Sequence, residues 1–256
     1  HCGECAPCQS GHYNRCENIE WHPSHPEGAL SEAFCYRAEA LFPVPQALTD
    51  DQVALVEPTA VAVHALDRAE IATADNIVII GAGTIGLSAV AIANARDINH
   101  VISIAKYAHQ ADMAAEMGAT DVIQHGEADP REVVPELLGR QGADASVDTV
   151  AVGTSFSTGI ALTRPGGTMV EVGGVTRPLL AALDPLVRRE INVRGSSCYA
   201  ASQGETDFNR AIQLIADGAI TPEKLVTHVF ALEEVQKAFE TADDKESGAI
   251  KVVVGE

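Results

Sequence analysis

The chain has 256 residues, 46% of them hydrophobic and 21% charged, which is enough for one large globular domain or two small ones. No apolar run approaches the length of a membrane-spanning helix, and no signal-peptide pattern is present. The formal net charge of -19, scattered along the chain, argues against nucleic acid or an anionic membrane as a partner. These properties predict a soluble, cytoplasmic protein with an acidic surface.

Four cysteines stand close together near the N-terminus, with the spacing C-x2-C-x2-C-x7-C. They are Cys2, Cys5, Cys8 and Cys16. Four thiolates on a short looped segment can form a closed tetrahedral zinc site, which leaves no open position for a substrate. Disulfides would require an oxidising compartment, to which nothing in the sequence points, and an iron–sulfur cluster is a further alternative. The pattern favours a structural Zn²⁺ ion.

The segment that follows the cysteines is predicted to form β-structure over residues 27–44 and then a helix over residues 53–66. Within this helix, the motif V-E-P-T-A-V-A-V-H-A places Glu57 directly before a proline in an otherwise apolar stretch. A carboxylate in such a place could pair with a cation, bind a metal, or face solvent as an ordinary helix-start residue. Glu57 is therefore a candidate functional residue.

The stretch over residues 76–86, N-I-V-I-I-G-A-G-T-I-G, joins an apolar run to three glycines at G-x-G-x-x-G spacing. The run is typical of a buried parallel strand, and the small apolar residues after it predict a helix over 84–96. In such a turn the first glycine permits the bend, the second lets the backbone approach a pyrophosphate, and the third lets the helix pack against the strand. Phosphates would bind at the helix N-terminus, where N–H groups and the helix dipole favour negative charge. The predicted nucleotide-binding residues of this turn are Gly81, Gly83, Thr84, Ile85 and Gly86.

From the glycine turn onward, predicted strands alternate with helices, which is typical of a parallel sheet with helical crossovers. The later strands are predicted at 100–105, 121–124, 145–152, 168–172 and 191–196. The helices are predicted at 109–117, 131–138, 155–162 and 207–217. Six such strands make a complete doubly wound α/β sheet of the Rossmann type. The tail, with strands at 226–230 and 249–254 around a helix at 233–241, breaks this alternation and is predicted to return to the N-terminal domain.

The end of the second predicted strand bears on the choice of nucleotide. In NAD-binding sheets of this type, an acidic residue about 20 positions after the glycine turn holds the ribose 2′-OH. Here Ala105 stands at that position and Lys106 follows it. Because no carboxylate would repel a 2′-phosphate and a cation lies beside it, the sequence favours NADP(H) over NAD(H).

Four motifs together resemble the zinc-dependent medium-chain alcohol/polyol dehydrogenases, and most of all their sorbitol, butanediol and threonine dehydrogenase branch. They are the cysteine-rich segment 2–16, V-E-P-x-A-V-A-V-H-A at 56–65, G-A-G-x-I-G at 81–86, and T-H-x-F-x-L-E at 227–233 followed by A-F-E at 238–240. The resemblance implies a Rossmann dinucleotide-binding domain over 59–219. It also implies part of a GroES-like, β-rich catalytic domain over 1–58 and 220–256.

The resemblance further implies hydride transfer between a nicotinamide nucleotide and a secondary alcohol, such as a polyol, sugar or diol, with a second, open zinc site that polarises the alcohol. Only Glu57 matches a position near that catalytic zinc, and Val172, Gly173 and Gly174 match residues that meet the nicotinamide. The cysteine and the G-H-E segment that the family places upstream of the structural zinc are not in the sequence. We therefore expect an N-terminally truncated chain that is inactive by itself.

The resemblance also implies a small-molecule alcohol or ketone as substrate and a homodimer or homotetramer as the assembly. The alternative, from another class of function, is a non-catalytic nucleotide-binding protein that keeps a structural zinc as an element of its fold.

Overall fold

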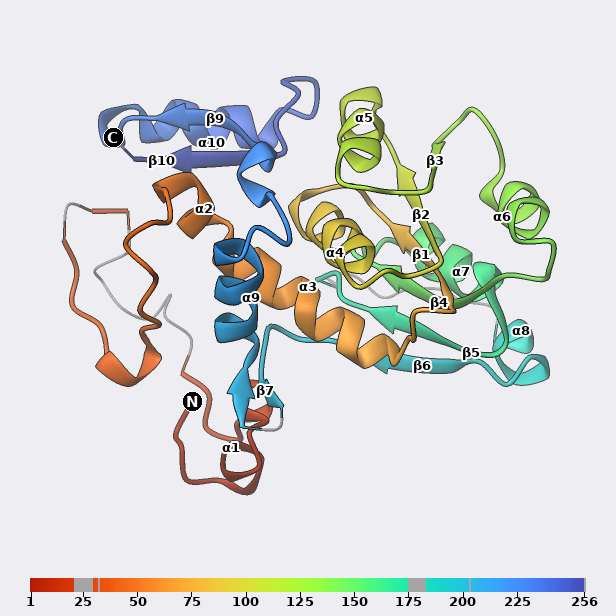
Figure 1. Ribbon diagram of the computed structural model, residues 1–256, viewed down its shortest axis with the longest axis horizontal. Coiled ribbons are helices and arrows are strands. Elements are labelled where there is room, and N and C mark those ends of the chain that lie inside the picture. The colour runs from red at the N-terminus through yellow and green to blue at the C-terminus, as the bar shows by residue number, and fades with distance from the viewer. Residues whose placement is uncertain (21–29, 32, 175–182, 203, 256) are drawn as a thin grey trace. The chain divides into compact units, whose positions relative to one another are not determined.

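The computed structural model describes residues 1–20, 30–31, 33–174, 183–202 and 204–255. The chain forms two compact units, the first made of His1–Ala60 and Cys198–Glu256 and the second of Val61–Ser197 (Figure 1). The limits of the two domains given above, 59–219 for one and 1–58 with 220–256 for the other, stay a prediction. In the described part of the chain, no helix is both long enough and apolar enough to cross a membrane.

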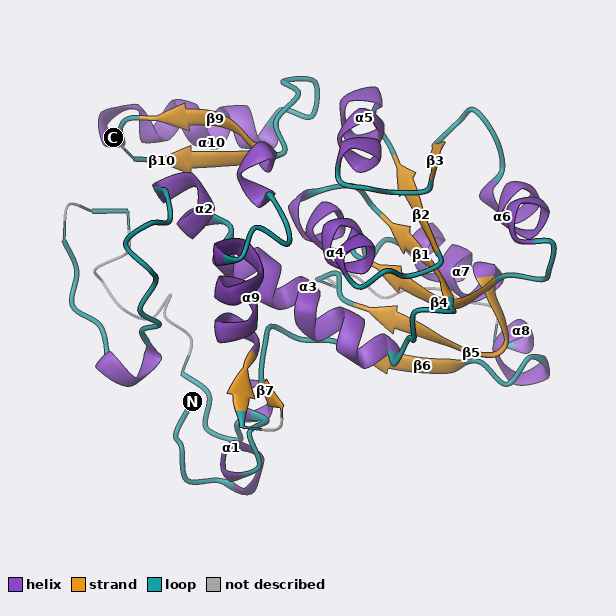
Figure 2. Ribbon diagram, viewed as in Figure 1, coloured by secondary structure: helices purple, strands orange, loops and turns teal. Residues whose placement is uncertain are grey.

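The second unit is built on a six-stranded sheet with the order β3-β2-β1-β4-β5-β6, in which every neighbouring pair is parallel (Figure 2). Its strands are β1 (Asn76–Ile80), β2 (His100–Ala105), β3 (Asp121–Gln124), β4 (Ala143–Asp148), β5 (Thr163–Glu171) and β6 (Asn192–Gly195). The order runs outward in both directions from the β1–β4 pair, as in a doubly wound sheet. The predicted Rossmann arrangement is confirmed.

Helices cover both faces of this sheet. They are α4 (Thr84–Ala95), α5 (Ala108–Glu116), α6 (Pro130–Leu138), α7 (Gly153–Leu162) and α8 (Asp184–Arg188), preceded by α3 (Val56–Ala69), which carries the chain from the first unit into the second. The helices α4 and α5 lie against β1, β2 and β3. The helices α6 and α7 contribute Val134 and Leu162 to a cluster of buried hydrophobic side chains, which also contains Val78 of β1 and Ile102 of β2. Because both faces are covered, all five residues of β1 are buried, which explains its apolar sequence.

The predicted limits that differ most from the structure in the second unit are those of the fourth and fifth strands. The fourth strand ends at Asp148 instead of residue 152, because the Asp148 carboxylate accepts hydrogen bonds from the backbone N–H groups of Val150 and Ala151 at 2.8 and 3.3 Å. Those bonds turn the chain away from the sheet ladder. The fifth strand begins earlier than predicted, at Thr163, and the short helix α8 was not predicted.

The first unit holds shorter elements. They are α1 (Ala6–Gln9), η1 (Tyr13–Arg15), η3 (Ala38–Ala40), α2 (Asp50–Ala54), β7 (Ala201–Ser202), β8 (Glu205–Thr206), α9 (Asp207–Ala216), η4 (Pro222–Leu225), β9 (Val226–Phe230), η5 (Leu232–Glu234), α10 (Val235–Asp243) and β10 (Lys251–Val254). The strands β9 and β10 form a parallel pair, and β7 and β8 form an antiparallel pair. The helix predicted over 53–66 is two helices, because α2 ends at Ala54, Leu55 is its C-cap, and α3 begins at Val56.

The β-structure predicted over residues 27–44 is wrong for the described part of that segment, residues 30–31 and 33–44, which contains the 3₁₀ turn η3 and no strand. Its large side chains, including Leu30, Phe34 and Tyr36, are exposed. A strand requires a hydrogen-bonded neighbour, and the sequence of one segment does not say whether the fold supplies it. Residues 27–29 and 32 lie outside the described residues.

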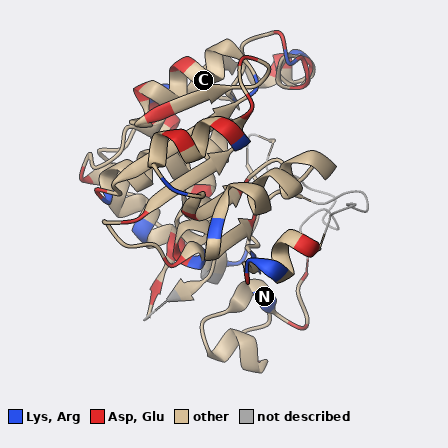
Figure 3. Cartoon of the chain, turned by 90° about the vertical axis from the view of Figure 1, so that its right-hand side faces the viewer, with Lys and Arg blue, Asp and Glu red and all other residues tan. Residues whose placement is uncertain are grey.

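Charged side chains are spread over the elements. Aspartate and glutamate number 36 against 17 lysines and arginines, and Figure 3 shows the acidic positions scattered, with basic positions between them.

Candidate functional site

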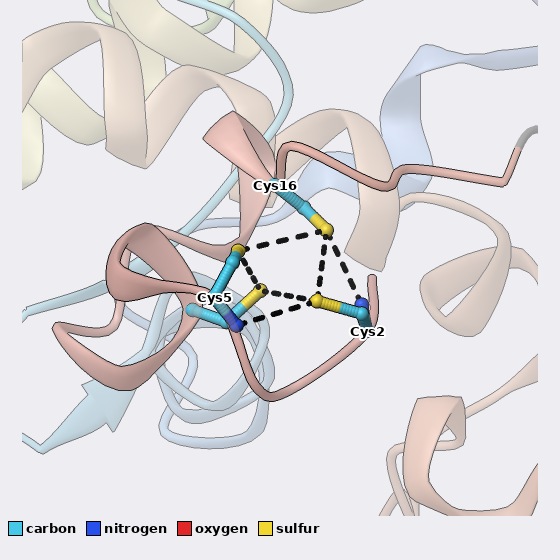
Figure 4. Close-up of side chains that lie close together, drawn as sticks. Cys2, Cys5 and Cys16 are labelled. Atoms are coloured by element: carbon cyan, nitrogen blue, oxygen red, sulfur yellow. Dashed lines mark hydrogen bonds between the residues drawn. The ribbon is translucent and has the colours of Figure 1, made fainter.

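The sulfur atoms of the four N-terminal cysteines come together in the first unit (Figure 4). All four Sγ atoms lie within 4.8 Å of one another. The separations are 3.4 Å for Cys5–Cys8, 3.5 Å for Cys2–Cys16, and 4.0 Å for both Cys2–Cys8 and Cys5–Cys16. A tetrahedral zinc ion with Zn–S bonds of about 2.3 Å would hold its sulfurs about 3.8 Å apart. The cluster therefore has the size that a four-cysteine zinc site requires.

The electrostatics of the cluster also suit a cation. The backbone N–H groups of Glu4 and Cys5 lower the pKa of Cys2 to about 6, and the Cys2 N–H in turn lies 3.2 Å from the Sγ of Cys16. Burial, followed by the neighbouring Cys5 sulfur, raises the pKa of Cys8 to about 12. Four crowded sulfurs cannot all ionise unless a positive ion compensates them, and this is what a bound metal would do.

Local backbone geometry brings the cysteines together. Gly3 and Gly11 have φ angles of 78° and 83°, in the left-handed region that glycine adopts without strain. The carbonyl of Gly11 accepts a hydrogen bond from the N–H of Ala201 at 2.8 Å, and the Tyr13 hydroxyl donates to the carbonyl of Ala200 at 3.2 Å. These two bonds fasten the cysteine segment to the C-terminal part of the same unit.

In the second unit, the glycine turn has the tight packing that its motif predicts. Gly81 has a φ angle of 96°, and a Cβ on it would lie 2.5 Å from Val150. A Cβ on Gly86 would lie only 1.8 Å from the carbonyl oxygen of Gly81, so the third glycine allows α4 to approach the turn. By contrast, a Cβ on Gly83 would meet nothing within 4 Å. The protein therefore packs tightly around the first and third glycines of the turn and leaves space beside the second.

The helix N-terminus faces this open position. Gly83 is the N-cap of α4, and no side chain caps the helix there. Thr84 and Ile85 form the first turn, where the backbone N–H groups point along the helix axis out of its N-terminus. An anion placed beside Gly83 would find these donors and the positive end of the helix dipole.

The loops after β4 and β5 complete this edge of the sheet. The Thr149 hydroxyl donates to the carbonyl of Ile80 at 2.9 Å and lies 3.3 Å from that of Gly81, and a Cβ on Gly173 would lie 2.4 Å from the Cβ of Ala151. Val172, Gly173 and Gly174 follow β5 directly, and Val175 lies outside the described residues. Sequence reasoning missed the part played by residues 149–151, because it extended the fourth strand through them.

A lysine and two aromatic rings follow the end of β2 in the chain. Ala105 is the last residue of β2 and is fully buried. Lys106 is exposed, and its ammonium nitrogen lies 5.1 Å from the centre of the Tyr107 ring. The Tyr107 ring stacks on that of His109, with centres 5.6 Å apart and planes inclined by 11°. A cation beside flat rings is suited to a phosphate and a purine.

Glu57 lies in the first turn of α3, in the first unit. Although the residue keeps an exposed surface, the surrounding protein displaces enough water to raise the pKa of its carboxyl, and Lys251 opposes this shift. Burial, and then the charge of Glu57, raise the pKa of the nearby Tyr199 to about 12. Among the described residues, the four cysteines are the one group of three or more metal-ligand side chains whose ligand atoms converge, and Glu57 is outside it.

Known proteins match this chain in sequence. A family model described as zinc-binding dehydrogenase matches residues 84–217. The D-xylulose reductase A of Aspergillus oryzae is 32% identical over 248 residues, which cover 93% of this chain and 67% of that protein. The sorbitol dehydrogenase of Bacillus subtilis is 29% identical over 255 residues, covering 99% of this chain and 71% of that protein.

Known structures match as well. A Sinorhizobium meliloti protein described as a zinc-binding dehydrogenase and solved with NADP is 26% identical, with a TM-score of 0.87 over 99% of this chain and 74% of that one. A short chain alcohol dehydrogenase of Escherichia coli, solved with NADH, has a TM-score of 0.87 over 98% of this chain and 73% of that one. Its 23% identity shows the fold alone.

These likenesses confirm the predicted resemblance and its fold class, a Rossmann sheet joined to part of a GroES-like domain. The family model covers more than half of the chain, and a polyol reductase matches it along nearly its whole length. This chain therefore belongs to the zinc-binding dehydrogenase family, in its medium-chain alcohol/polyol branch.

Proposed function

We propose that this chain serves an oxidoreductase that transfers a hydride between NADP(H) and a secondary alcohol of a polyol, sugar or diol in a zinc-dependent reaction. The observation that carries the proposal is the carboxyl edge of the sheet, where an uncapped helix start, an open glycine and an exposed lysine come together. Polyol enzymes among its relatives, named for xylulose and sorbitol, support the substrate class.

In this proposal the chain's own residues bind and orient the nucleotide. The first turn of α4 and Gly83 hold the pyrophosphate, and Gly81 and Gly86 give the turn its shape. Lys106, next to the uncharged Ala105, pairs with the 2′-phosphate. The segment 172–174 lies along the nicotinamide, whose C4 atom supplies or accepts the hydride when the nucleotide is bound.

The proposal gives the cysteine cluster a structural role. Four sulfurs fill a tetrahedral shell, so a zinc ion held there has no position for an alcohol. Glu57 is proposed to lie beside a separate catalytic zinc. We expect the 256-residue polypeptide, assayed by itself, not to turn over alcohol, because its cysteine cluster is closed and the described residues bring no second ligand set together. Assembly as a homodimer or homotetramer and a cytoplasmic location belong to the same proposal.

A test of the nucleotide preference uses equilibrium titration of NADPH and NADH fluorescence. We expect NADPH to bind about tenfold more tightly than NADH, which corresponds to one charge-assisted contact of about 1.4 kcal/mol. Lys106→Ala should remove this advantage and leave NADH binding unchanged, since Lys106 is exposed. Ala105→Asp should favour NADH if the buried position accommodates the carboxylate. Tighter binding of NADH to the unaltered chain would contradict the preference.

Metal analysis and a turnover assay test the remaining parts. We expect one firmly bound zinc per chain and no alcohol oxidation by the polypeptide alone. Turnover by this polypeptide would contradict the proposed inactivity. The alternative function, a nucleotide-binding protein that is not an enzyme, predicts nucleotide binding without turnover even after the residues of a catalytic zinc site are supplied.

A further inference from the structure

Two carboxyl groups meet at the carboxyl edge of the sheet, beside the proposed nucleotide site. Asp148 is the last residue of β4 and Glu171 is the last residue of β5, and the two are direct partners in the parallel register. Residues paired in this way project from the same face of the sheet. Because neighbouring strands lie about 4.8 Å apart, the two carboxyl groups are neighbours at this edge of the sheet.

Three of the four oxygens of these two carboxyl groups have no hydrogen-bond donor in the described part of the chain. Asp148 is 0% exposed, and among the described residues no donor reaches its Oδ2 atom or either carboxyl oxygen of Glu171, all three of which are sealed from solvent. The other oxygen of Asp148, Oδ1, accepts the N–H groups of Val150 and Ala151. Two adjacent buried carboxylates would repel each other, whereas a single proton placed between them supplies a donor to two of the three oxygens.

We propose that Asp148 and Glu171 share one proton, and that this acid–carboxylate pair positions the loops 149–152 and 172–174 on the two sides of the nucleotide site. The proposal rests on the proposed nucleotide site of the second unit. Oδ1 of Asp148 already accepts two backbone N–H groups, so the proton is placed on Glu171, which donates it to Oδ2 of Asp148.

The two loops depend on this pair through their backbones. Asp148 holds the loop after β4 through the two N–H groups on its Oδ1. The N–H of Gly173, in the loop after β5, donates to the backbone carbonyl of Asp148 at 3.2 Å, and Gly173 packs against Ala151. Repulsion between the carboxylates would therefore separate loops that are otherwise in contact. Both Asp148 and Glu171 are positioning residues.

Glu171 should titrate near neutrality. Burial, and then the charge of Asp148, raise the pKa of Glu171 to about 7, above its ordinary value of 4.5. Of the described charged residues in β6 and α8, Arg194 pairs with Glu70 at 2.6 Å, and Asp184 and Arg188 pair with each other at 2.7 Å. Above pH 7 the proton leaves and the two carboxylates repel.

The experiment measures nucleotide affinity against pH. The dissociation constants of NADPH and NADH are determined between pH 5.5 and 9 for the unaltered chain and for Glu171→Gln, whose amide donates to Asp148 at every pH. We expect affinity for both nucleotides to fall about tenfold above pH 7 in the unaltered chain and to stay level in Glu171→Gln. Glu132→Gln, an exposed position in α6 with the same change of charge, should behave as the unaltered chain. An equal pH dependence in Glu171→Gln would overturn the proposal.

A second measurement does not need the nucleotide. The infrared carbonyl band of a protonated carboxyl should be present in the nucleotide-free protein at pH 6, disappear with a midpoint near pH 7, and be missing from Glu171→Gln. Asp148→Asn, which removes the repelling charge, should move the midpoint to lower pH. Absence of the band would overturn the shared proton. If the band titrates as expected but neither nucleotide binds at any pH, the proposed function is wrong. The shared proton would then be confirmed, but it would have no role in nucleotide binding.

Discussion

The two units of this chain are stabilised in different ways. In the second unit, strands β1 and β4 are buried between layers of helices, and β1 has no exposed residue. In the first unit, the cysteine segment 1–18 forms only α1 and η1, which together contain no buried residue, and Cys16 is its one buried cysteine. A sheet covered on both faces excludes water by itself, whereas a short looped segment has no such core. The proposed zinc ion would supply the missing crosslink.

The strongest test of this contrast concerns the glycine turn of the second unit. We expect Gly86→Ala to cost at least about 3 kcal/mol of stability and to abolish nucleotide binding, because its Cβ would stand 1.8 Å from the Gly81 carbonyl oxygen. Gly83→Ala is the matched control, since its Cβ meets open space. It should unfold at nearly the normal temperature, yet weaken nucleotide binding by about tenfold because the methyl group points at the proposed pyrophosphate. Thermal unfolding and fluorescence titration report the two effects. Normal stability and affinity in Gly86→Ala would contradict the packing.

Removal of the proposed zinc should affect the first unit alone. With a strong chelator, or in Cys8→Ser, we expect faster hydrogen exchange in the cysteine segment and in residues 200–201, to which it is bonded. Exchange in β1 and β2 should stay slow, because hydrophobic packing holds them. Cys35→Ser is the control, because Cys35 is exposed and outside the cluster. Equal effects of the two serine variants would argue against a metal site.

The difference between the buried sheet of the second unit and the loops of the first also explains which elements could be predicted from the sequence. Strands β2, β3 and β9 have the limits that were predicted, and α4 ends within one residue of its predicted limit. The central strand β1 is covered on both faces, so its burial leaves an uninterrupted apolar run in the sequence. The β-structure predicted over 27–44 failed because a strand also depends on a partner, which lies elsewhere in the chain.

The candidate site was predictable only in part. The spacing of the glycines and cysteines carries its own geometry, so both clusters were found from the sequence. The partnership of Asp148 with Glu171 depends on strand register, which no local pattern reveals. A signal was present, since each is an acidic residue at the end of an apolar strand, but the sequence does not show that the two strands are neighbours.

The last prediction concerns the opposite, amino edge of the sheet, where an ion-pair network adds to the stability of the second unit. Asp144 of β4 accepts a hydrogen bond from the backbone N–H of Asn76 at 2.8 Å, from Arg164 Nε at 2.6 Å and from Arg140. Asp144→Asn should cost about 2 kcal/mol at pH 7, because an amide cannot satisfy two guanidinium groups. Asp184→Asn breaks an exposed pair with Arg188 and should cost less than about 0.5 kcal/mol.

The pH dependence of this effect identifies its cause. Burial acts to raise the pKa of Asp144, but the hydrogen bonds from Arg140, Arg164 and Asn76 outweigh it and hold the pKa below the ordinary value of 3.8. A carboxyl whose pKa is lowered on folding stabilises the protein above its unfolded-state pKa and loses that contribution as the pH falls through the folded-state value. Denaturant unfolding of the unaltered chain and Asp144→Asn should therefore differ at pH 7 and converge below about pH 4. If the free energies of unfolding of the two proteins differed as much in acid as at pH 7, Asp144 would act through packing and not through its charge. The second unit would then differ from the first by its hydrophobic burial alone.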